Sequence, residues 1–273
     1  MNYNNERFLA PAIDSALSQS HPLSEVIVVD DCSTDNSRAV IARYADRIKS
    51  VLRETNEGQI AATNSAWPLA RYPILIFLDS DDLLFPTRRR KCRQDLAGCD
   101  REGAIPLAII DKAGQQGGPV ATKYPPHLDA ATLRAELLRT GGSPNSPGSG
   151  NAYSRSLLDC ITADRGFELE FPRDISMDTI LEYNAPFYGE VVTVYAPLAC
   201  YRVHDGNDTL QTIVDKARFG KMSRYFACKL DYLVERYQIW GVKFDPVVPV
   251  RMRNRAPDKP SQSIGCDIER RPI

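Results

Sequence analysis

The 273-residue sequence lacks several features that would assign it directly to a common class of protein. Its seven cysteines are scattered, odd in number and contain no Cys-x-x-Cys pair, so neither a disulfide framework nor a zinc site is indicated. No run of about 18 apolar residues occurs, and the N-terminus lacks the apolar stretch of a signal peptide. These absences predict a cytoplasmic protein without a transmembrane segment, and they are compatible with peripheral association at the inner face of a membrane.

The sequence also lacks an excess of charge and the glycine-rich loops that hold phosphates. Its formal net charge of −1 gives no reason to expect a nucleic-acid partner. The basic run at positions 88–93 is more simply a solvated helix face than an anion-binding patch. Neither G-x-G-x-x-G nor G-x-x-x-x-G-K-[S/T] occurs, so side chains and a metal would have to hold any diphosphate.

What the sequence does contain is an alternation of strand and helix patterns. The early part predicts helices over 6–19, 36–46 and 58–70, and strands over 25–29, 49–52, 73–78 and 105–110. The later part predicts helices over 154–161, 178–185 and 209–237, and a strand within 191–204. Alternation of this kind predicts a three-layer α/β fold with a mostly parallel sheet.

Two acidic clusters follow predicted strands: Asp30 and Asp31 in one, and Asp79, Asp81 and Asp82 in the other. Because ligands of such sheets bind beyond the carboxyl ends of the strands, we expect both clusters to border one crevice. The segment "LDSDD" has three interpretations: caps for the next helix, a catalytic carboxylate pair, or ligands of a hard metal ion. The second acidic cluster favours the metal, because it could hold the organic part of a phosphorylated ligand.

Three segments together resemble family 2 glycosyltransferases of the GT-A fold: "NYNNERFLAPAIDSALSQSHPLSEVIVVDDCSTDNS", "NEGQIAATNSAW" and "ILIFLDSDDLLFP". The resemblance is close over residues 2–100 and continues more weakly through "GSGNAYSR", "MDTILEY" and "YRVHDGN". It implies an inverting enzyme that moves a sugar from a nucleoside-diphosphate-sugar, expected to be UDP-linked, to an acceptor hydroxyl. The implied acceptor is a glycan, a lipid-linked molecule or a protein, as in polysaccharide biosynthesis, and the implied cofactor is Mn²⁺ or Mg²⁺.

The resemblance also implies which residues bind the nucleotide. Tyr3 matches the place of an aromatic residue that packs on the base. Asp31 matches the acid that hydrogen-bonds a uracil-type base edge, with its neighbour Asp30 as the alternative. The segment that approaches the nucleotide contributes Asn56, Gly58 and Asn64. For these last three, turn and helix-cap chemistry is an equally good explanation.

The acidic segment matches the family's Asp-x-Asp motif, with Ser80 as its middle residue. Asp79 would approach the ribose or the metal, and Asp81 would ligate the metal that bridges the two phosphates. Asp82 is the alternative ligand, because three carboxylates leave the register of the motif open. Mg²⁺ and Mn²⁺ usually take one or two carboxylates, with waters and substrate phosphates as the remaining ligands.

Two later motifs match the remaining groups. Asp178 is the expected general base, although Met177 stands where the family carries Glu; an ordinary N-cap is the competing role, and Glu182 is the reserve base. In "YRVH", Arg202 would offset leaving-group charge and His204 would contact phosphate or metal. The small residues of "GSGN" at positions 148–151 would allow close approach of a ligand, or form a flexible linker.

The sequence departs from the family in lacking the first apolar strand, which relatives carry just before the position of Met1. From the patterns we expect a glycosyltransferase domain over 1–205, a helical extension over 206–243 and an irregular tail over 244–273.

Without a central strand the alternative function is a non-catalytic module that binds sugar nucleotides or another protein. A phosphatase that forms an aspartyl-phosphate is a weaker alternative, because Leu83 and Leu84 fit its motif poorly.

Overall fold

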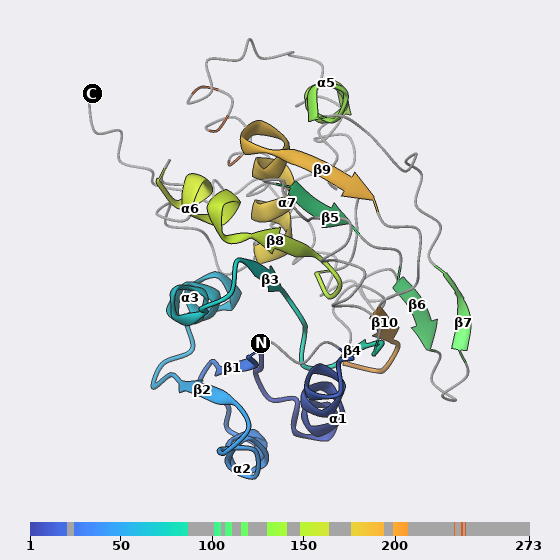
Figure 1. The fold of residues 1–273 in the computed structure, drawn as a ribbon. Coiled ribbons are helices and arrows are strands. Elements are labelled where there is room, and N and C mark those ends of the chain that lie inside the picture. The colour runs from blue at the N-terminus through green and yellow to red at the C-terminus, as the bar shows by residue number, and fades with distance from the viewer. Residues whose placement is uncertain are drawn as a thin grey trace, which may run out of the picture.

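The computed structural model describes residues 1–20, 25–86, 101–104, 107–110, 116–119, 130–140, 148–163, 176–193 and 199–206, with residues 232, 236 and 238. Within them the N-terminal elements alternate as predicted (Figure 1). In order they are α1 (Glu6–Leu17), β1 (Ile27–Asp30), α2 (Ser37–Ala42), β2 (Lys49–Leu52), α3 (Gln59–Ala66), a 3₁₀ turn (Trp67–Leu69) and β3 (Ile74–Ile76). The last predicted helix turn after residue 66 becomes 3₁₀ where Pro68 interrupts the α-helix.

An apolar stripe on α1 explains why this helix covers the first strand. Leu9 and Ile13 are one helical turn apart and both are buried. They form one core cluster with Val28 of β1 and with Val40 and Ile41 of α2. Burial of each such side chain stabilises the fold by about 1.5–3 kcal/mol.

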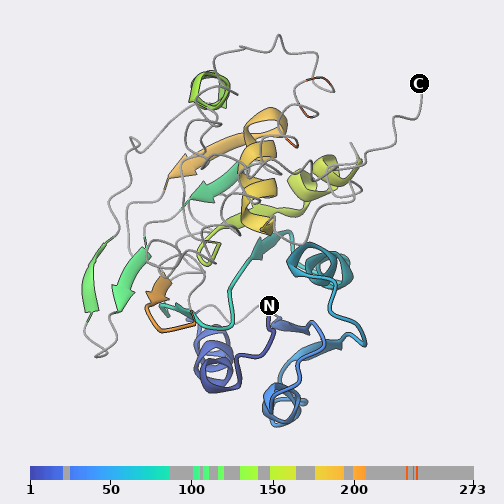
Figure 2. The same ribbon diagram turned by 180° about the vertical axis from the view of Figure 1, so that it is seen from behind.

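The C-terminal part of the fold contains more strands than the sequence pattern predicted (Figure 2). Its elements are β4 (Leu83–Leu84), β5 (Arg101–Ala104), β6 (Leu107–Ile110), β7 (Gln116–Pro119), α5 (Ala130–Thr140), β8 (Ala152–Ser154), α6 (Arg155–Ala163), α7 (Met177–Tyr188), β9 (Glu190–Thr193) and β10 (Ala199–Arg202). Side chains of α5, α6 and α7 form the largest core cluster, for example Leu137, Ile161 and Ile180. This second core carries α7, the helix that bears Asp178.

The sheet is mixed among the described strands. One group pairs β1 with β2, a second has the order β3-β8-β5-β9, and a third has the order β4-β10-β6-β7. The pairs β1–β2, β5–β9 and β6–β10 are parallel, whereas the connections through β8, β4 and β7 are antiparallel. The α/β class is therefore confirmed. The antiparallel pairs, which include both pairings of the internal strand β8, qualify the expectation of a mostly parallel sheet.

A cavity of about 460 Å³ separates β1 from β3. Its wall includes apolar side chains of both strands, such as Val28, Ile74 and Ile76. The chain's N-terminus lies between the two strands in both views (Figures 1 and 2). There the Met1 ammonium donates to the Leu78 carbonyl oxygen (2.7 Å), and Asn2 forms a parallel bridge with Asp30.

Some predictions lie outside the described residues. They include almost all of the helix over 209–237, the tail over 244–273, and the helix and basic run after Pro86. The domain boundaries at 205 and 243 therefore stay predictions. Among the helices that the structure describes, none is long and apolar enough to cross a membrane.

Candidate active site

The segment Asp79–Asp82 forms a tight turn just beyond β3. The Asp82 amide donates to the Asp79 carbonyl oxygen (3.2 Å), which closes the turn. The Asp79 amide donates to Ser149 Oγ (2.8 Å), a buried hydroxyl in the small-residue loop over 148–151. This loop is therefore fixed against the acidic turn rather than acting as a free linker.

The two carboxylates that compete for the metal role differ in exposure. Asp82 is only 1% exposed, and its Oδ1 accepts a hydrogen bond from the Arg202 amide (3.0 Å). The Asp81 side chain is 21% exposed, and its Oδ2 lies 3.1 Å from Nε2 of His204. The Gly206 amide donates to His204 Nδ1 (3.1 Å), so Nε2 carries the ring proton and donates to Asp81. Asp81 is thus the more accessible carboxylate.

The acidic turn concentrates negative charge in a buried place. Burial raises the pKa of Asp82 to about 8, and the nearby Asp79 and Asp81 carboxylates add to the rise. Burial also raises the pKa of Asp79 to about 6; the Met1 ammonium opposes this rise, while Asp81 and Asp178 add to it. A bound cation would relieve this repulsion.

The carboxylate oxygens of the acidic turn fit a hard divalent metal ion whose coordination shell is completed by a substrate. Across the described residues, no group of three or more His, Cys, Asp or Glu side chains is arranged to hold a metal by itself. Mg²⁺ and Mn²⁺ need no such cage, because one or two carboxylates with waters and phosphates suffice. Carboxylate oxygens of the Asp79–Asp82 turn are the chemically suitable ligands.

Asp178 lies in the first turn of α7, and Gly148 separates it from the acidic turn. A Cβ atom on Gly148 would lie 3.3 Å from Asp79 Oδ2 and 3.4 Å from the Cβ of Asp178. The two carboxylates therefore flank one glycine and border the same space. Glu182, one turn further, is buried and accepts a hydrogen bond from Asn151 Nδ2 (3.3 Å).

Arg202 braces the acidic turn through backbone groups. Its Nε donates to the Asp81 carbonyl oxygen, and its Nη2 donates to the carbonyl oxygen of Phe8 (3.0 Å). Its guanidinium also lies over the Phe8 ring, 5.0 Å from the centroid. The ring of His204 lies against the same Phe8, at a centroid distance of 4.2 Å. A direct role of Arg202 on a leaving group stays a prediction.

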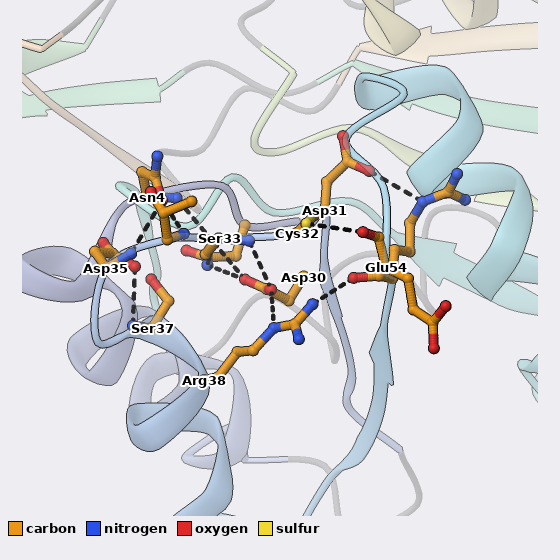
Figure 3. A network of polar contacts seen from close by, with 12 residues as sticks. Asn4, Asp30, Asp31, Cys32, Ser33, Asp35, Ser37, Arg38 and Glu54 are labelled. Atoms are coloured by element: carbon orange, nitrogen blue, oxygen red, sulfur yellow. Dashed lines mark hydrogen bonds and ion pairs between the residues drawn. The ribbon is translucent and has the colours of Figure 1, made fainter.

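Asp30 lies fully buried at the end of β1, within a network of hydrogen bonds (Figure 3). It accepts hydrogen bonds from Asn2 Nδ2 (2.8 Å), the Ser33 amide (3.0 Å) and Arg38 Nε (3.0 Å), besides the Ser33 hydroxyl. Burial opposes its ionisation, but the hydrogen bonds from Ser33, Asn2 and Arg38 outweigh burial and lower its pKa. Asp30 is therefore an ionised structural centre that shapes the loop after β1.

Asp31 anchors the start of α3. Its Oδ2 accepts from the Gly58 amide (2.7 Å), its Oδ1 accepts from the Glu57 amide (3.3 Å), and Arg53 Nε lies 3.0 Å from Oδ1. Gly58 has a φ of 90°, which glycine adopts more easily than other residues. The helix-cap explanation for Gly58 thus has a direct structural basis.

The remaining predicted residues are placed as follows. Tyr3 is 48% exposed, so its ring is available to a ligand or to solvent. Asn56 is half-buried just before α3, and the buried Oδ1 of Asn64 has no hydrogen-bond partner among the described residues. Ser80 Oγ accepts from Asn5 Nδ2 (2.9 Å). The N-terminal segment therefore contacts both acidic clusters, through Asn2 at Asp30 and through Asn5 at Ser80.

The pattern of a known family matches most of this site. A sequence model described as "Glycosyl transferase family 2" matches residues 1–162. The chain belongs to glycosyl transferase family 2. An uncharacterized glycosyltransferase of Nostoc sp. (strain PCC 7120) is 33% identical over 218 residues, which cover 76% of this chain and 64% of that relative. The chain thus spans slightly less than two thirds of the relative's length.

Solved structures of glycosyltransferases share the fold of this family 2 chain. S. aureus TarS 1-349 in complex with UDP-GlcNAc matches with a TM-score of 0.59 and 20% identity, over 83% of this chain and 64% of that one. The mannosyltransferase PcManGT from Pyrobaculum calidifontis, in complex with GDP-Man and Mn²⁺, matches with a TM-score of 0.57 and 19% identity, over 93% of this chain and 67% of that one. The likeness confirms the GT-A fold.

Sequence reasoning missed three polar residues of this family 2 site. Asn2 binds Asp30, Ser149 binds the Asp79 amide, and Gln59 contacts both Asp79 and the start of α7. The small-residue run at 148–151 was a usable signal for Ser149. Gln59 stood within a quoted motif, but only its three-dimensional neighbours reveal its contacts.

Proposed function

We propose that this chain transfers a sugar, with inversion, from a nucleoside-diphosphate-sugar to an acceptor hydroxyl. The observation that carries the proposal is that Asp79 and Asp178 flank Gly148, which puts the acidic turn and the expected base beside one space. The sugar nucleotides named with the two structural neighbours, UDP-GlcNAc and GDP-Man, support this donor class. A UDP-linked donor is our first choice, because Asp31 occupies the place of the acid expected to bind uracil.

A divalent ion, Mn²⁺ or Mg²⁺, would supply Lewis-acid stabilisation of the diphosphate leaving group when bound. We assign its protein ligands to Asp81 and Asp79, since Asp81 is the more exposed carboxylate and Asp82 is bound inward by the Arg202 amide. The Mn²⁺ in the mannosyltransferase neighbour supports the use of a divalent ion. His204 donates to Asp81 and so fixes the orientation of that carboxylate.

Asp178 would accept the proton of the acceptor hydroxyl as that oxygen attacks the anomeric carbon. It lies in the first turn of α7, where the helix dipole stabilises negative charge. A positioned general base contributes about 10²–10⁴-fold to the rate. Asp178 Oδ1 accepts from the Thr179 amide (2.8 Å). The competing N-cap role for Asp178 is wrong, because α7 begins at Met177 and its N-cap is Ser176.

The nucleotide would lie toward β1, where Tyr3, Asp30 and Asp31 gather near the N-terminus. Tyr3 would pack on the base and Asp31 would accept from its edge. Asn56, Gly58 and Asn64 border the same side through α3. We place the reaction in the cytoplasm, at or near the membrane when the acceptor is lipid-linked, and we leave glycan and protein acceptors as the other acceptor classes.

The test is release of nucleoside diphosphate from a panel of UDP- and GDP-sugars, with Mn²⁺ or with EDTA. We expect Mn²⁺-dependent turnover that Asp81→Ala and Asp178→Ala each reduce by about 10²-fold or more. Asp46→Ala, which removes an exposed carboxylate on another part of the surface, is the control. Unchanged turnover in both site variants would overturn the assignment. Nucleotide binding without turnover from any donor would favour the alternative, a non-catalytic sugar-nucleotide-binding module.

A further inference from the structure

Gln59 bridges two parts of the site that are far apart in sequence. Its Oε1 accepts a hydrogen bond from the Met177 amide (2.9 Å), and its Nε2 lies 3.5 Å from Asp79 Oδ1 as a donor. Gln59 is the first residue of α3, Met177 is the first residue of α7, and Asp79 follows β3. One carboxamide therefore contacts the starts of two helices and the acidic turn.

The contact with Gln59 gives the Met177 amide, at the N-terminus of α7, a hydrogen-bond acceptor. The first amides of an α-helix have no acceptor within the helix, and an N-cap side chain usually supplies one. The N-cap residue, Ser176, makes no side-chain cap bond; its hydroxyl lies 2.9 Å from that of Thr179 instead. Gln59 thus supplies an acceptor from another helix, directly before Asp178.

The bridge through Gln59 therefore restricts the position of the Asp178 carboxylate relative to that of Asp79. Asp178 follows Met177 by one residue, so a bond that holds the Met177 amide also limits where Asp178 lies. The second end of the same carboxamide faces Asp79. A displacement of about 1 Å in an active site can cost about 10²-fold in rate, so a bridge of this kind matters for catalysis.

We propose that Gln59 is a positioning residue that holds the start of α7, and with it Asp178, in place relative to Asp79. The proposal rests on the proposed function for its catalytic consequence, but the bridge itself can be tested without turnover. Both ends of the carboxamide are used: the oxygen accepts from Met177 and the nitrogen donates toward Asp79. The shorter hydrogen bond, from the Met177 amide, contributes more to the positioning of Asp178 than the longer contact with Asp79.

The test compares Gln59→Leu, which removes both contacts, with Gln59→Glu, which keeps an oxygen acceptor for Met177. Gln19→Leu is the matched control, because the Gln19 carboxamide also links two segments, by donating to the carbonyl oxygens of Ser15 and Phe85, but lies outside the site. Hydrogen exchange at the Met177 amide is measured without ligands. We expect Gln59→Leu to accelerate it by about tenfold or more, and Gln59→Glu and Gln19→Leu to leave it slow. Equal exchange in Gln59→Leu and the wild type would overturn the proposal.

Kinetics then test the catalytic consequence. We expect Gln59→Leu to lower kcat by about 10–100-fold, with little change in donor KM or in Mn²⁺ affinity measured by electron paramagnetic resonance without donor. Gln59→Glu should restore only part of kcat, because it keeps the acceptor for Met177 but replaces the donor to Asp79 with a carboxylate. Faster exchange with an unchanged kcat would overturn the positioning role. Absence of turnover in the wild type would count against the proposed function instead, and the exchange result would still decide whether the bridge exists.

Discussion

Gly148 lies where the acidic turn and α7 approach each other closely. An added Cβ would lie 3.3 Å from an Asp79 oxygen, tighter than ordinary van der Waals contact, and 3.4 Å from the Cβ of Asp178. Because both neighbours are proposed to act directly in the reaction, even a shift of Asp79 by a few tenths of an ångström to accommodate the methyl group would alter the geometry of the site. We expect Gly148→Ala to lower kcat by about tenfold or more while the free energy of unfolding changes by less than about 1 kcal/mol. Unaltered turnover would mean that the two carboxylates do not act together across this glycine.

Asp82 gives the protein a pH-dependent stability when no metal is bound. Its pKa is raised to about 8 in the folded state, chiefly by burial, whereas an unfolded carboxyl titrates near its ordinary value of 3.8. Between these values the folded state keeps a proton that the unfolded state releases, so stability falls as pH rises from about 4 to about 8. Asp79, with a pKa raised to about 6, adds to the fall at the lower end of that range.

The expected consequence is that Asp82→Asn stabilises the metal-free protein more at high pH than at low pH. One pKa unit corresponds to about 1.4 kcal/mol, so we expect a gain of at least about 1 kcal/mol at pH 8 and a much smaller gain at pH 5. Urea unfolding in EDTA at both pH values measures this gain in the free energy of unfolding, with Asp46→Asn, at an exposed position, as the control. A gain that is equal at the two pH values would contradict the raised pKa.

Single residues of the site were predictable to the extent that a motif carried them. The ordered motifs indicated Asp79, Asp81 and Asp178 without coordinates. The choice between Asp81 and Asp82 required the structure, because it depends on a bond from the Arg202 amide, 120 residues away in sequence. The same limit applies to Gln59, whose partner Met177 is 118 residues distant.

At the scale of elements, β10 supports the acidic turn through Arg202. A lysine at this position keeps the positive charge but cannot reproduce the planar set of bonds from the guanidinium to the carbonyl oxygens of Phe8, Asp81 and Asp82. We expect Arg202→Lys to lower the free energy of unfolding by about 1–3 kcal/mol and to lower turnover with it. Arg43→Lys, at an exposed position of α2's C-cap, is the control. Lost turnover with unchanged stability would instead indicate a direct role of Arg202 on the leaving group.

The bounds of some elements were predicted closely, whereas strands without a local pattern were not predicted. The bounds of β2 agree with the predicted 49–52, and α1 and α7 lie within two or three residues of their predicted bounds. By contrast, β8 contains only Ala152–Ser154 and is held by pairing with β3, which no local pattern reveals. Its inward residue Tyr153 stacks edge-on against Phe77, a contact between distant segments.

At the scale of the whole molecule, a cavity of about 460 Å³ lies between β1 and β3 of the described residues. The carbonyls of Val26 and Asp30 accept from amides on the β2 side, so the alternate residues Ile27 and Val29 direct their backbone groups toward the cavity. Val29 uses its carbonyl there to accept from the Asn2 amide (2.8 Å). The space therefore offers both apolar walls and hydrogen-bonding edges to an extended segment.

An apolar segment of about five β-branched residues, fused ahead of Met1, should consequently stabilise the fold. Burial of two or three such side chains contributes about 3–9 kcal/mol before the ordering entropy is subtracted, so we expect a net gain of about 1–3 kcal/mol. Urea unfolding measures the gain, and a Gly/Ser segment of the same length is the control. Equal stability of the two fusions would show that this cavity does not accept a strand.

Calorimetric titration with UDP tests whether the Asp79–Asp82 turn holds a nucleoside diphosphate through a divalent ion. The wild type and Asp81→Ala are each titrated with Mn²⁺ and with EDTA. We expect UDP to bind the wild type at least about tenfold more tightly with Mn²⁺ than with EDTA, a difference of about 1.4 kcal/mol, and we expect Asp81→Ala to abolish this difference. Equal UDP affinity in Mn²⁺ and in EDTA, or an Mn²⁺ effect that survives in Asp81→Ala, would contradict this role of the turn.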